Sequence, residues 1–493
     1  MKRMRKLLSV LCALSLLVCL AVFAAADGTT CTLTLNNSGA TAHTFEVYQI
    51  FTGDLSVNDA GGKVLANIVW GSGVTADGQT AMGNAAEKAE SITTEAEAAA
   101  FANDLVANGY LTGAASVTVA AGASGSVADL APGYYLVKDV DGTQDLENGA
   151  YTAYLLQVVG DVTATTKLDT PFVEKKVKDI NESEDADISD NAWQDSADHD
   201  IGDIIPYQLT GTLPGNFASY ETYTYQFTDE LSGGLTYQAD AKVYLVNGET
   251  ETDITSYAAI APAAATAGAT LTVSFEDLRT VPGVTAASKI VVRYTAELNE
   301  NAVIGAAGNP NTVYLTYSNN PNPNGTGTGT TPKDKVIVFT YELHVDKVDE
   351  NEEALPGAGF SLYKKTPAGE WELVEEIAAG SGTSFTFSGL DDGEYKLVES
   401  TVPVGYNKIE DVIFTITADH ETESADPQLI TLTAMQEATI DDGTIALSVV
   451  NKGGSILPST GGAGTRMLYL LGGLLCVGAV VLLVTKKRMR AED

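Results

Sequence analysis

The stretch LHVDK at residues 343–347 decides the class of fold, because its apolar and polar side chains alternate. Successive side chains of a β-strand point to opposite faces, so Leu343, Val345 and Lys347 share one face of the predicted strand. Two further stretches alternate in the same way and end in a polar residue: Tyr395, Leu397 and Glu399, then Leu447, Val449 and Asn451. The three strands therefore direct a lysine, a glutamate and an asparagine into one core.

A second group of strands, between residues 173 and 320, repeats this arrangement. Lys175 lies between two valines on one face, Asp229 follows alternating aromatic residues, and Asn319 ends the alternating run at 313–319. Lys176 and Asn320 are rivals, because a one-residue slip in register would exchange the faces. Alternation favours Lys175 and Asn319.

The three residue types suggest a chemical reason for their common burial. Burial lowers the pKa of a lysine and raises that of a carboxylic acid, so the pair can be a neutral amine and a protonated acid. The amine can then attack the asparagine carboxamide, which the acid polarises, and expel ammonia to leave a Lys–Asn amide crosslink. Ordinary salt bridges and hydrogen bonds at domain rims would explain the same pattern, and alternation does not choose between the two.

The rest of the chain is rich in Thr, Val, Tyr and Gly, with period-2 stretches bounded by turn residues. This pattern is typical of tandem immunoglobulin-like β-sandwich domains, and predicts a mainly β fold. One short helical insertion is expected in the first domain, because Thr94 and Glu97 form a capping box before an Ala-rich run that ends at Asn108-Gly109.

Composition shifts divide the chain into domains at 27–166, 167–330 and 331–452. The second boundary follows a turn-rich linker of low complexity at 321–332. The acidic segment Asp179–Asp203 has no EF-hand spacing, so a solvated, flexible loop is expected there instead of a calcium loop.

Both ends of the chain carry targeting patterns. Residues 1–26 have the basic, apolar and small-residue order of a secretory signal peptide, with cleavage expected between Ala26 and Asp27. The segment at 453–493 contains an apolar run at 467–485, long enough for a transmembrane helix, and a basic cluster follows it. Taken alone, this tail is a membrane anchor.

Composition excludes several classes of function. The 493 residues contain 28 Lys+Arg against 65 Asp+Glu, a net charge of −37, which argues against nucleic acid as a partner. With Cys31 the one cysteine between the two targeting segments, a disulfide framework is excluded, and no metal or cofactor is predicted. The motifs of an anchored hydrolase, such as G-x-S-x-G or H-E-x-x-H, are missing from the sequence, so no enzyme is expected.

The C-terminal segment resembles the cell-wall sorting signal of Gram-positive surface proteins. The resemblance rests on the order of an LPSTG pentapeptide, a spacer, an apolar run and basic residues; the pentapeptide is Leu457, Pro458, Ser459, Thr460 and Gly461. In that family a sortase cysteine cleaves between the residues that correspond here to Thr460 and Gly461. The acyl group of Thr460 then passes to an amine.

All three domains resemble parts of sortase-assembled pilins. The third is similar to the B-type domains of collagen adhesins and pilins, the middle one to the second domain of backbone pilins, and the first to the pilin N-terminal domain. The motifs that carry this are Leu355-Pro-Gly357, Pro403-x-Gly405-Tyr406, Gly202-Asp203, Leu209–Pro214, Gly234–Tyr237 and Ala131–Val137. The resemblance implies isopeptide bonds from Lys347 to Asn451 with Glu399 as acid, and from Lys175 to Asn319 with Asp229 as acid. No Lys/Asn pair is evident in the first domain.

By this resemblance the chain is expected to be the major subunit of a covalent pilus, exported and anchored to the Gram-positive cell wall. Lys167 matches the acceptor lysine of polymerisation by its spacing from Lys175, although Lys138 or Lys176 could substitute. The partners implied are a pilin-type and a housekeeping sortase, other copies of the chain, accessory pilins, peptidoglycan and host surface ligands. A wall-anchored monomeric adhesin or a tip pilin is the alternative.

Overall fold

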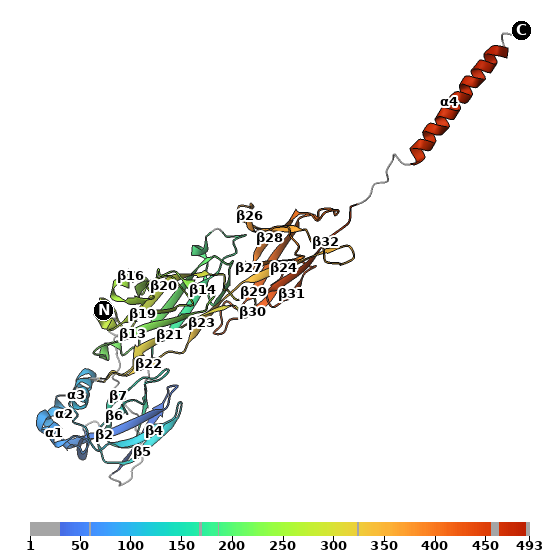
Figure 1. Ribbon diagram of the computed structural model, residues 1–493. Coiled ribbons are helices and arrows are strands. Elements are labelled where there is room, and N and C mark those ends of the chain that lie inside the picture. Colours follow the sequence, from blue (N-terminus) through green and yellow to red (C-terminus); the bar gives the residue numbers. More distant parts are fainter. Residues whose placement is uncertain are drawn as a thin grey trace, which may run out of the picture.

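The computed structural model describes residues 30–58, 61–166, 170–185, 187–322, 325–454 and 463–489. Within these ranges the chain forms three two-sheet sandwiches that follow one another along one direction, from blue through green to orange in Figure 1. The prediction of a mainly β chain of tandem sandwich domains is confirmed.

The first sandwich packs the sheet β5-β1-β8 against a sheet of order β3-β2-β6-β7, in which β4 also pairs with β2. Its strands are β1 (Cys31–Asn37), β2 (His43–Val57), β3 (Lys63–Trp70), β4 (Ala115–Val119), β5 (Ser124–Leu130), β6 (Gly133–Asp139), β7 (Ala153–Val158) and β8 (Val162–Thr166). The two sheets enclose Leu33, Phe45 and Val137 between them.

Three helices pack on the outer face of the larger sheet of the first sandwich: α1 (Ala76–Met82), α2 (Ala85–Glu90) and α3 (Glu95–Ala107). The predicted helix is α3, and its capping box is present, with the Thr94 hydroxyl accepting from the Glu97 amide and the Glu97 carboxylate from the Thr94 amide. Sequence analysis missed α1 and α2. Seven and six residues are too few to show a helical period.

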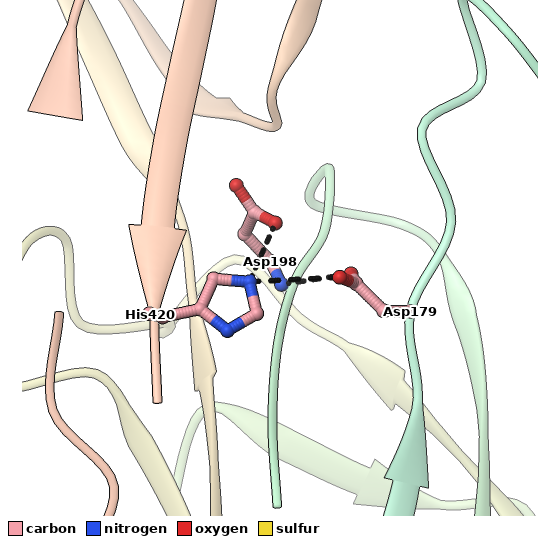
Figure 2. Close-up of side chains that lie close together, drawn as sticks. All are labelled: Asp179, Asp198 and His420. Atoms are coloured by element: carbon pink, nitrogen blue, oxygen red, sulfur yellow. Dashed lines mark hydrogen bonds and ion pairs between the residues drawn. The ribbon is translucent and has the colours of Figure 1, made fainter. Parts of the chain in front are cut away.

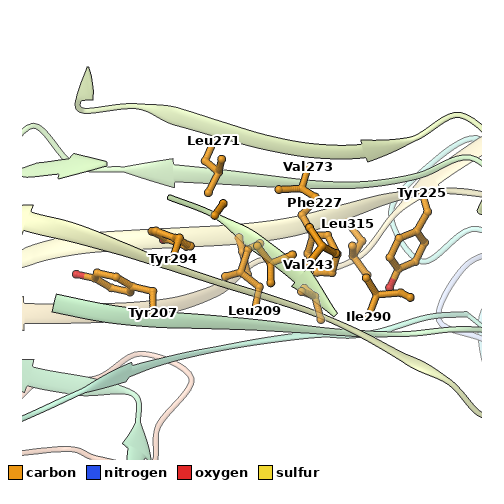
Figure 3. Packing of buried hydrophobic residues seen from close by; sticks show 14 of the residues in the cluster. Tyr207, Leu209, Tyr225, Phe227, Val243, Leu271, Val273, Ile290, Tyr294 and Leu315 are labelled. Carbon is orange, nitrogen blue, oxygen red and sulfur yellow. The ribbon is translucent and has the colours of Figure 1, made fainter. Parts of the chain in front are cut away.

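The middle sandwich packs a sheet of order β10-β9-β12-β20-β14-β18 against one of order β11-β23-β21-β13-β19-β17, and aromatic and aliphatic side chains fill the space between them (Figure 3). In addition, β15 pairs with β16 and β20, and β22 with β21. The strands are β9 (Val173–Lys178), β10 (Trp193–Gln194), β11 (Ser196–Asp198), β12 (Ile204–Thr212), β13 (Tyr225–Leu231), β14 (Leu235–Tyr237), β15 (Lys242–Asn247), β16 (Thr250–Asp253), β17 (Ala259–Ala261), β18 (Thr266–Ala267), β19 (Thr270–Phe275), β20 (Lys289–Leu298), β21 (Asn309–Ser318), β22 (Thr328–Thr330) and β23 (Asp334–Phe339).

The third sandwich packs the sheet β27-β24-β32-β31 against the sheet β26-β25-β28-β29-β30. Its strands are β24 (Tyr341–Asp349), β25 (Gly359–Lys365), β26 (Trp371–Ile377), β27 (Ser384–Leu390), β28 (Gly393–Thr401), β29 (Val412–His420), β30 (Leu429–Thr433), β31 (Thr439–Asp441) and β32 (Thr444–Asn451). The first and last strands, β24 and β32, pair in parallel with Lys347 opposite Val449.

The middle and third sandwiches share a nearly continuous strand. β23 pairs with β21 of the middle sandwich, and only Thr340 separates it from β24 of the third. The strand therefore belongs to the middle sandwich up to Phe339, beyond the boundary expected at residue 330. Hydrogen bonds from the Ile201 amide to the Gly389 carbonyl (3.0 Å) and from the Asp195 amide to the Thr422 carbonyl (2.9 Å) tie the two sandwiches together.

The segment 179–203 is not the solvated loop that its acidic composition predicted. It contributes β10 and β11 to the two sheets of the middle sandwich, and residues 195–199 are buried. The third sandwich supplies part of that cover, because Asp195 Oδ2 accepts from the Ser424 amide (2.8 Å). Local sequence does not reveal burial by a domain that lies two hundred residues away in the chain.

The C-terminal helix α4 (Ala463–Met489) contains the predicted membrane span. Residues Met467–Lys487 have a mean hydropathy of 2.6 and are long and apolar enough to cross a membrane, and no part of this stretch is buried against the protein. An apolar helix without a protein surface to cover it is typical of a membrane anchor.

Candidate crosslinking sites

The middle sandwich encloses a lysine–aspartate pair. The Lys175 amine, on β9, lies 2.7 and 2.8 Å from the two carboxylate oxygens of Asp229, on β13 of the opposite sheet. Neither residue is exposed to solvent. The rings of Tyr207 and Tyr294 flank the amine, at 5.2 and 5.4 Å from their centroids. Both residues therefore occupy the buried face that alternation predicted.

The Tyr294 hydroxyl extends this pair to an asparagine that sequence analysis did not select. It donates to Asp229 Oδ2 (2.5 Å) and accepts from the Lys175 amine (3.0 Å) and from Asn311 Nδ2 (2.7 Å). The Lys175 and Asn311 nitrogens therefore lie close together, because both contact the same hydroxyl oxygen. Asn311 is fully buried, and its carbonyl oxygen Oδ1 accepts no hydrogen bond among the described residues.

Burial sets the protonation states of this group. It lowers the pKa of Lys175, against the opposing effect of Asp229, and it raises the pKa of Asp229, against the opposing effect of Lys175. Both shifts favour the uncharged forms, a neutral amine and a protonated acid. A neutral amine is a nucleophile, which an ammonium is not.

The predicted partner Asn319 lies elsewhere. Asp229 is paired with Val313 across β13 and β21, so Asn319 is six residues further along the chain, or roughly 20 Å for an extended strand. Its Nδ2 donates to the Gln144 carbonyl of the first sandwich (2.6 Å), and its own carbonyl accepts from the Tyr151 amide (2.9 Å). The pairing of Lys175 with Asn319 is therefore wrong, and Asn319 joins the first and middle sandwiches instead.

A signal for Asn311 was present in the sequence. Asn311 lies on β21 and Asn319 directly follows that strand, and both point to the same face because an even number of residues separates them. Alternation therefore gives the face of both residues, but the choice between the two ends of the strand depends on how β21 is aligned with β13. Of the rivals left open, Lys176 points outward and its amine pairs with Asp195 Oδ1 (2.8 Å), while Asn320 is only partly buried.

The third sandwich brings together the three residues that the sequence predicted there. Asn451 Nδ2 donates to Glu399 Oε1 (2.7 Å), and the Lys347 amine donates to the Val449 carbonyl (3.0 Å), two residues before Asn451. All three side chains are buried, and Asn451 Oδ1 accepts no hydrogen bond among the described residues. Burial lowers the pKa of Lys347, against the opposing effect of Glu399. A lysine with a lowered pKa, an acid and an unpartnered carboxamide oxygen thus occur in this core too.

The first sandwich holds a different buried group. His43 Nδ1 and Asp139 Oδ1 are 2.8 Å apart with both side chains fully buried, and burial raises the pKa of Asp139. The amine of Lys138 lies 3.2 Å from Glu46 Oε2. Cys31 is a free, buried thiol on β1, and burial raises its pKa.

Several predicted sites fall outside the described residues. They are the signal cleavage site at Ala26 and Asp27, the acceptor Lys167, and the sorting pentapeptide Leu457, Pro458, Ser459, Thr460 and Gly461.

Two of the three sandwiches match models of known protein families. Residues 201–321 match the family model of the Gram-positive pilin backbone subunit 2, Cna-B-like domain, and residues 341–428 match the SpaA prealbumin-like fold domain. These matches define a chain built from pilin-type sandwich domains.

Individual relatives agree with this class. The trypsin-resistant surface T6 protein of Streptococcus pyogenes serotype M6 is 23% identical over 364 residues, which are 58% of this chain and 65% of that protein. The solved T6 backbone pilin of serotype M6 S. pyogenes superposes with a TM-score of 0.55 at 18% identity, covering 88% of this chain and 100% of that one. The full-length major pilin SpaD of Corynebacterium diphtheriae gives 0.48 at 18% identity over 86% and 98% of the two chains.

The chain spans about two thirds of the length of the curated relative that it matches. Its middle and third sandwiches carry the domain families of Gram-positive pilins. In particular, residues 201–321 are similar to the backbone subunit domain of these pilins.

Proposed function

We propose that this chain is the major structural subunit of a covalently polymerised surface pilus, anchored to peptidoglycan at the Gram-positive cell surface. The observation that carries the proposal is a buried lysine, acid and asparagine group in each of two consecutive pilin-type sandwiches. Such groups cost stability unless they are paired or react, which supports a role that rewards internal crosslinks.

In the middle sandwich the crosslink would join Lys175 to Asn311. The amine attacks Cγ of the carboxamide, the Nζ–Cγ bond forms, the Cγ–Nδ2 bond breaks, and ammonia leaves. The proton lost by Nζ has a route to the leaving nitrogen through Asp229 and the Tyr294 hydroxyl, since hydrogen bonds connect all four groups. No water or cofactor enters the balance, and the reaction happens once in each molecule without turnover.

In the third sandwich the same reaction would join Lys347 to Asn451. Glu399 is hydrogen-bonded to the Asn451 amide nitrogen, so it is placed to pass a proton to the departing ammonia. The Ile409 amide donates to the other Glu399 oxygen (3.1 Å) and fixes the orientation of the carboxyl group.

Polymerisation would use two sites that lie far apart in the sequence, Lys167 and Thr460. A pilin-type sortase thiolate attacks the Thr460 carbonyl, breaks its bond to Gly461, and holds Thr460 as a thioester. The neutral amine of Lys167 in the next subunit then attacks this thioester, forms an amide and releases the thiolate. Because the donor and the acceptor are different surfaces, the joining is head-to-tail and gives an open filament.

The remaining partners follow from this assembly. A housekeeping sortase would transfer the last Thr460 to peptidoglycan, accessory pilins would join the same fibre, and host surface ligands would meet the exposed fibre. The alternative, a monomeric wall-anchored adhesin or tip pilin, predicts no polymer of this chain.

Immunoblots of wall extracts boiled in detergent test the proposal. The wild-type host should give a ladder of high-mass bands, and a Lys167→Ala strain should give monomer alone, still attached through Thr460. Lys176→Ala is the matched control, because the sequence left this lysine open as an acceptor, but its amine is paired with Asp195 Oδ1 (2.8 Å) and Glu423 Oε2 (3.2 Å), so its loss should leave the ladder intact. A single wild-type band would contradict the pilus, whereas a normal ladder from the Lys167→Ala strain would contradict only the acceptor.

A further inference from the structure

The junction between the middle and third sandwiches contains a histidine that faces two carboxylates (Figure 2). His420 ends β29 of the third sandwich, and its Nε2 lies 3.4 Å from Asp198 Oδ1 and 3.5 Å from Asp179 Oδ2, both in the middle sandwich. The His420 and Asp198 side chains are 7% and 4% exposed, and that of Asp179 is 26% exposed. The three groups converge on a site that is open to solvent only on the Asp179 side.

The hydrogen bonds around His420 determine which ring nitrogen carries a proton. The Ser196 hydroxyl donates to the Glu421 carbonyl (2.7 Å), so its oxygen accepts from His420 Nδ1 (2.8 Å). Nδ1 is therefore protonated, and the lone pair of the neutral ring is on Nε2, the atom that faces the carboxylates. A histidine ligand of a metal ion is commonly held in this way, with its other nitrogen donating to a protein oxygen.

The distances fit ligands around an ion better than direct hydrogen bonds. A charge-assisted N–H···O contact is typically about 2.8 Å, and both contacts of Nε2 are longer. Ligand bonds of 2.0–2.2 Å in tetrahedral geometry place ligand atoms about 3.4 Å apart. The three ligand atoms lie within 4.8 Å of one another, which is close to the spacing of ligands around one ion.

The carboxylates are held in place, and one of their oxygens lacks a partner. Asp179 Oδ1 accepts from the Asp198 amide (3.1 Å), and its Oδ2 accepts from Gln194 Nε2 (2.9 Å). Asp198 Oδ2 is buried and accepts no hydrogen bond among the described residues. Asp391 and Asp392 place further carboxylate oxygens within 4.8 Å of Asp198. A buried carboxylate oxygen without a hydrogen-bond partner is costly, and a bound cation would offset part of that cost.

We propose that Asp179, Asp198 and His420 bind one divalent transition-metal ion of the zinc type, with water in the fourth position. The imidazole decides the class of ion, since calcium takes six to eight oxygen ligands and zinc takes mixed nitrogen and oxygen ligands. Two ligands come from the middle sandwich and one from the third, so the ion would fix the angle between two consecutive sandwiches. The site stands independently of the proposed pilus function.

A proton occupies the same place when no ion is bound. Burial lowers the pKa of His420, but Asp179 and Asp198 outweigh that effect and raise the pKa to about 10. The metal-free site is therefore an imidazolium between two carboxylates, and the ion would replace one proton. These two states of one site are what the experiment has to distinguish.

Zinc titration of the full chain in detergent, against a chromophoric chelator, tests the proposal. After treatment with EDTA, the wild-type chain should bind one equivalent of zinc, and His420→Gln should weaken the affinity at least 100-fold. His344→Gln is the matched control, because His344 also faces a carboxylate at 3.5 Å but is exposed and has only one such neighbour; its affinity should equal that of the wild type. Asp179→Asn provides a second ligand variant on the solvent side, with an expected loss of the same order.

Cobalt substitution supplies a readout that does not depend on any variant. One equivalent of Co²⁺ should give the intense visible absorption of a tetrahedral site, and added zinc should abolish it. The absence of stoichiometric zinc binding by the wild-type chain would overturn the proposal, as would unchanged binding by His420→Gln. Binding of calcium in place of zinc would overturn the assigned class of ion.

Discussion

Replacing Asn311 by alanine should return one ammonia to the mass of the chain. The wild-type protein is expected to weigh two ammonias less than its sequence, one for each crosslink, because each amide bond from a lysine to an asparagine expels the carboxamide nitrogen. Asn311→Ala leaves Lys175 without a partner, so one loss remains, the one at Asn451. Intact mass spectrometry of the chain, with peptide mapping of the Lys175–Asn311 pair, measures this directly.

Asn319→Ala is the matched control for this experiment. It removes an asparagine that directly follows β21 and points to the same face, but one that is bonded to the Gln144 carbonyl and not to Lys175 or Tyr294. Its mass deficit should stay at two ammonias. A wild-type mass equal to the sequence mass would refute the crosslinks. A deficit that Asn319→Ala reduces and Asn311→Ala does not would refute the assignment of Asn311.

The loss of this bond should also be visible as a loss of stability. A crosslink between positions 175 and 311 closes a loop of 136 residues in the unfolded chain, and the chain-entropy model gives about 5 kcal/mol for a loop of that length. For a domain of this size, such a change corresponds to a fall in Tm of about 10–20 °C. Calorimetry should show the fall for Asn311→Ala equally with and without reductant, because no disulfide contributes.

The fold was largely predictable because alternation is a local property. Lys347, Glu399 and Asn451 each end an alternating series, and each is buried in the structure as that series requires. The capping box at Thr94 likewise fixed the start of α3. The helices α1 and α2 are too short to repeat a helical pattern several times, so the sequence contains too little information to predict them.

The middle site shows where local reasoning ends. Alternation predicts which face Lys175, Asp229, Asn311 and Asn319 occupy. How β9, β13 and β21 are aligned along their lengths depends instead on contacts between two sheets. This alignment places Asn311, and not Asn319, beside the Lys175–Asp229 pair, and it places Tyr294 of β20 between them. In the third sandwich, the strands β24 and β32, which carry Lys347 and Asn451, are direct parallel neighbours, so these two residues meet at the same end without this ambiguity.

The prediction of a solvated loop at 179–203 was wrong for a related reason. Its charges predict solvent exposure, yet Asp198 and His199 are buried, and the third sandwich packs against the same segment at Asp195 and Ser196. The closeness of that contact is evident at Gly389, where a Cβ would lie 2.5 Å from Ile201 side-chain atoms. Burial created between domains is not encoded in the period of either segment.

Replacing Asp229 by alanine should abolish the middle crosslink and destabilise the sandwich beyond the loss of the bond. Without the acid, the proton route from Lys175 through Tyr294 to Asn311 is broken, so one ammonia should return. In addition, a buried amine loses the carboxyl group to which it is hydrogen-bonded, and an unsatisfied buried polar group typically costs about 1–3 kcal/mol. Together with the lost loop closure of about 5 kcal/mol, the middle domain should unfold at much lower urea concentration than in Asn311→Ala.

A double variant separates the two effects. Lys175→Met with Asp229→Leu also prevents the crosslink, but it replaces the buried pair by apolar side chains, which leaves no unpaired charge. Its urea midpoint should therefore lie near that of Asn311→Ala and well above that of Asp229→Ala. Glu399→Ala is the control for specificity, since it should return the other ammonia and leave the Lys175–Asn311 peptide intact. If Asp229→Ala still loses two ammonias, Asp229 is not the acid, and the lysine reacts because of its burial alone.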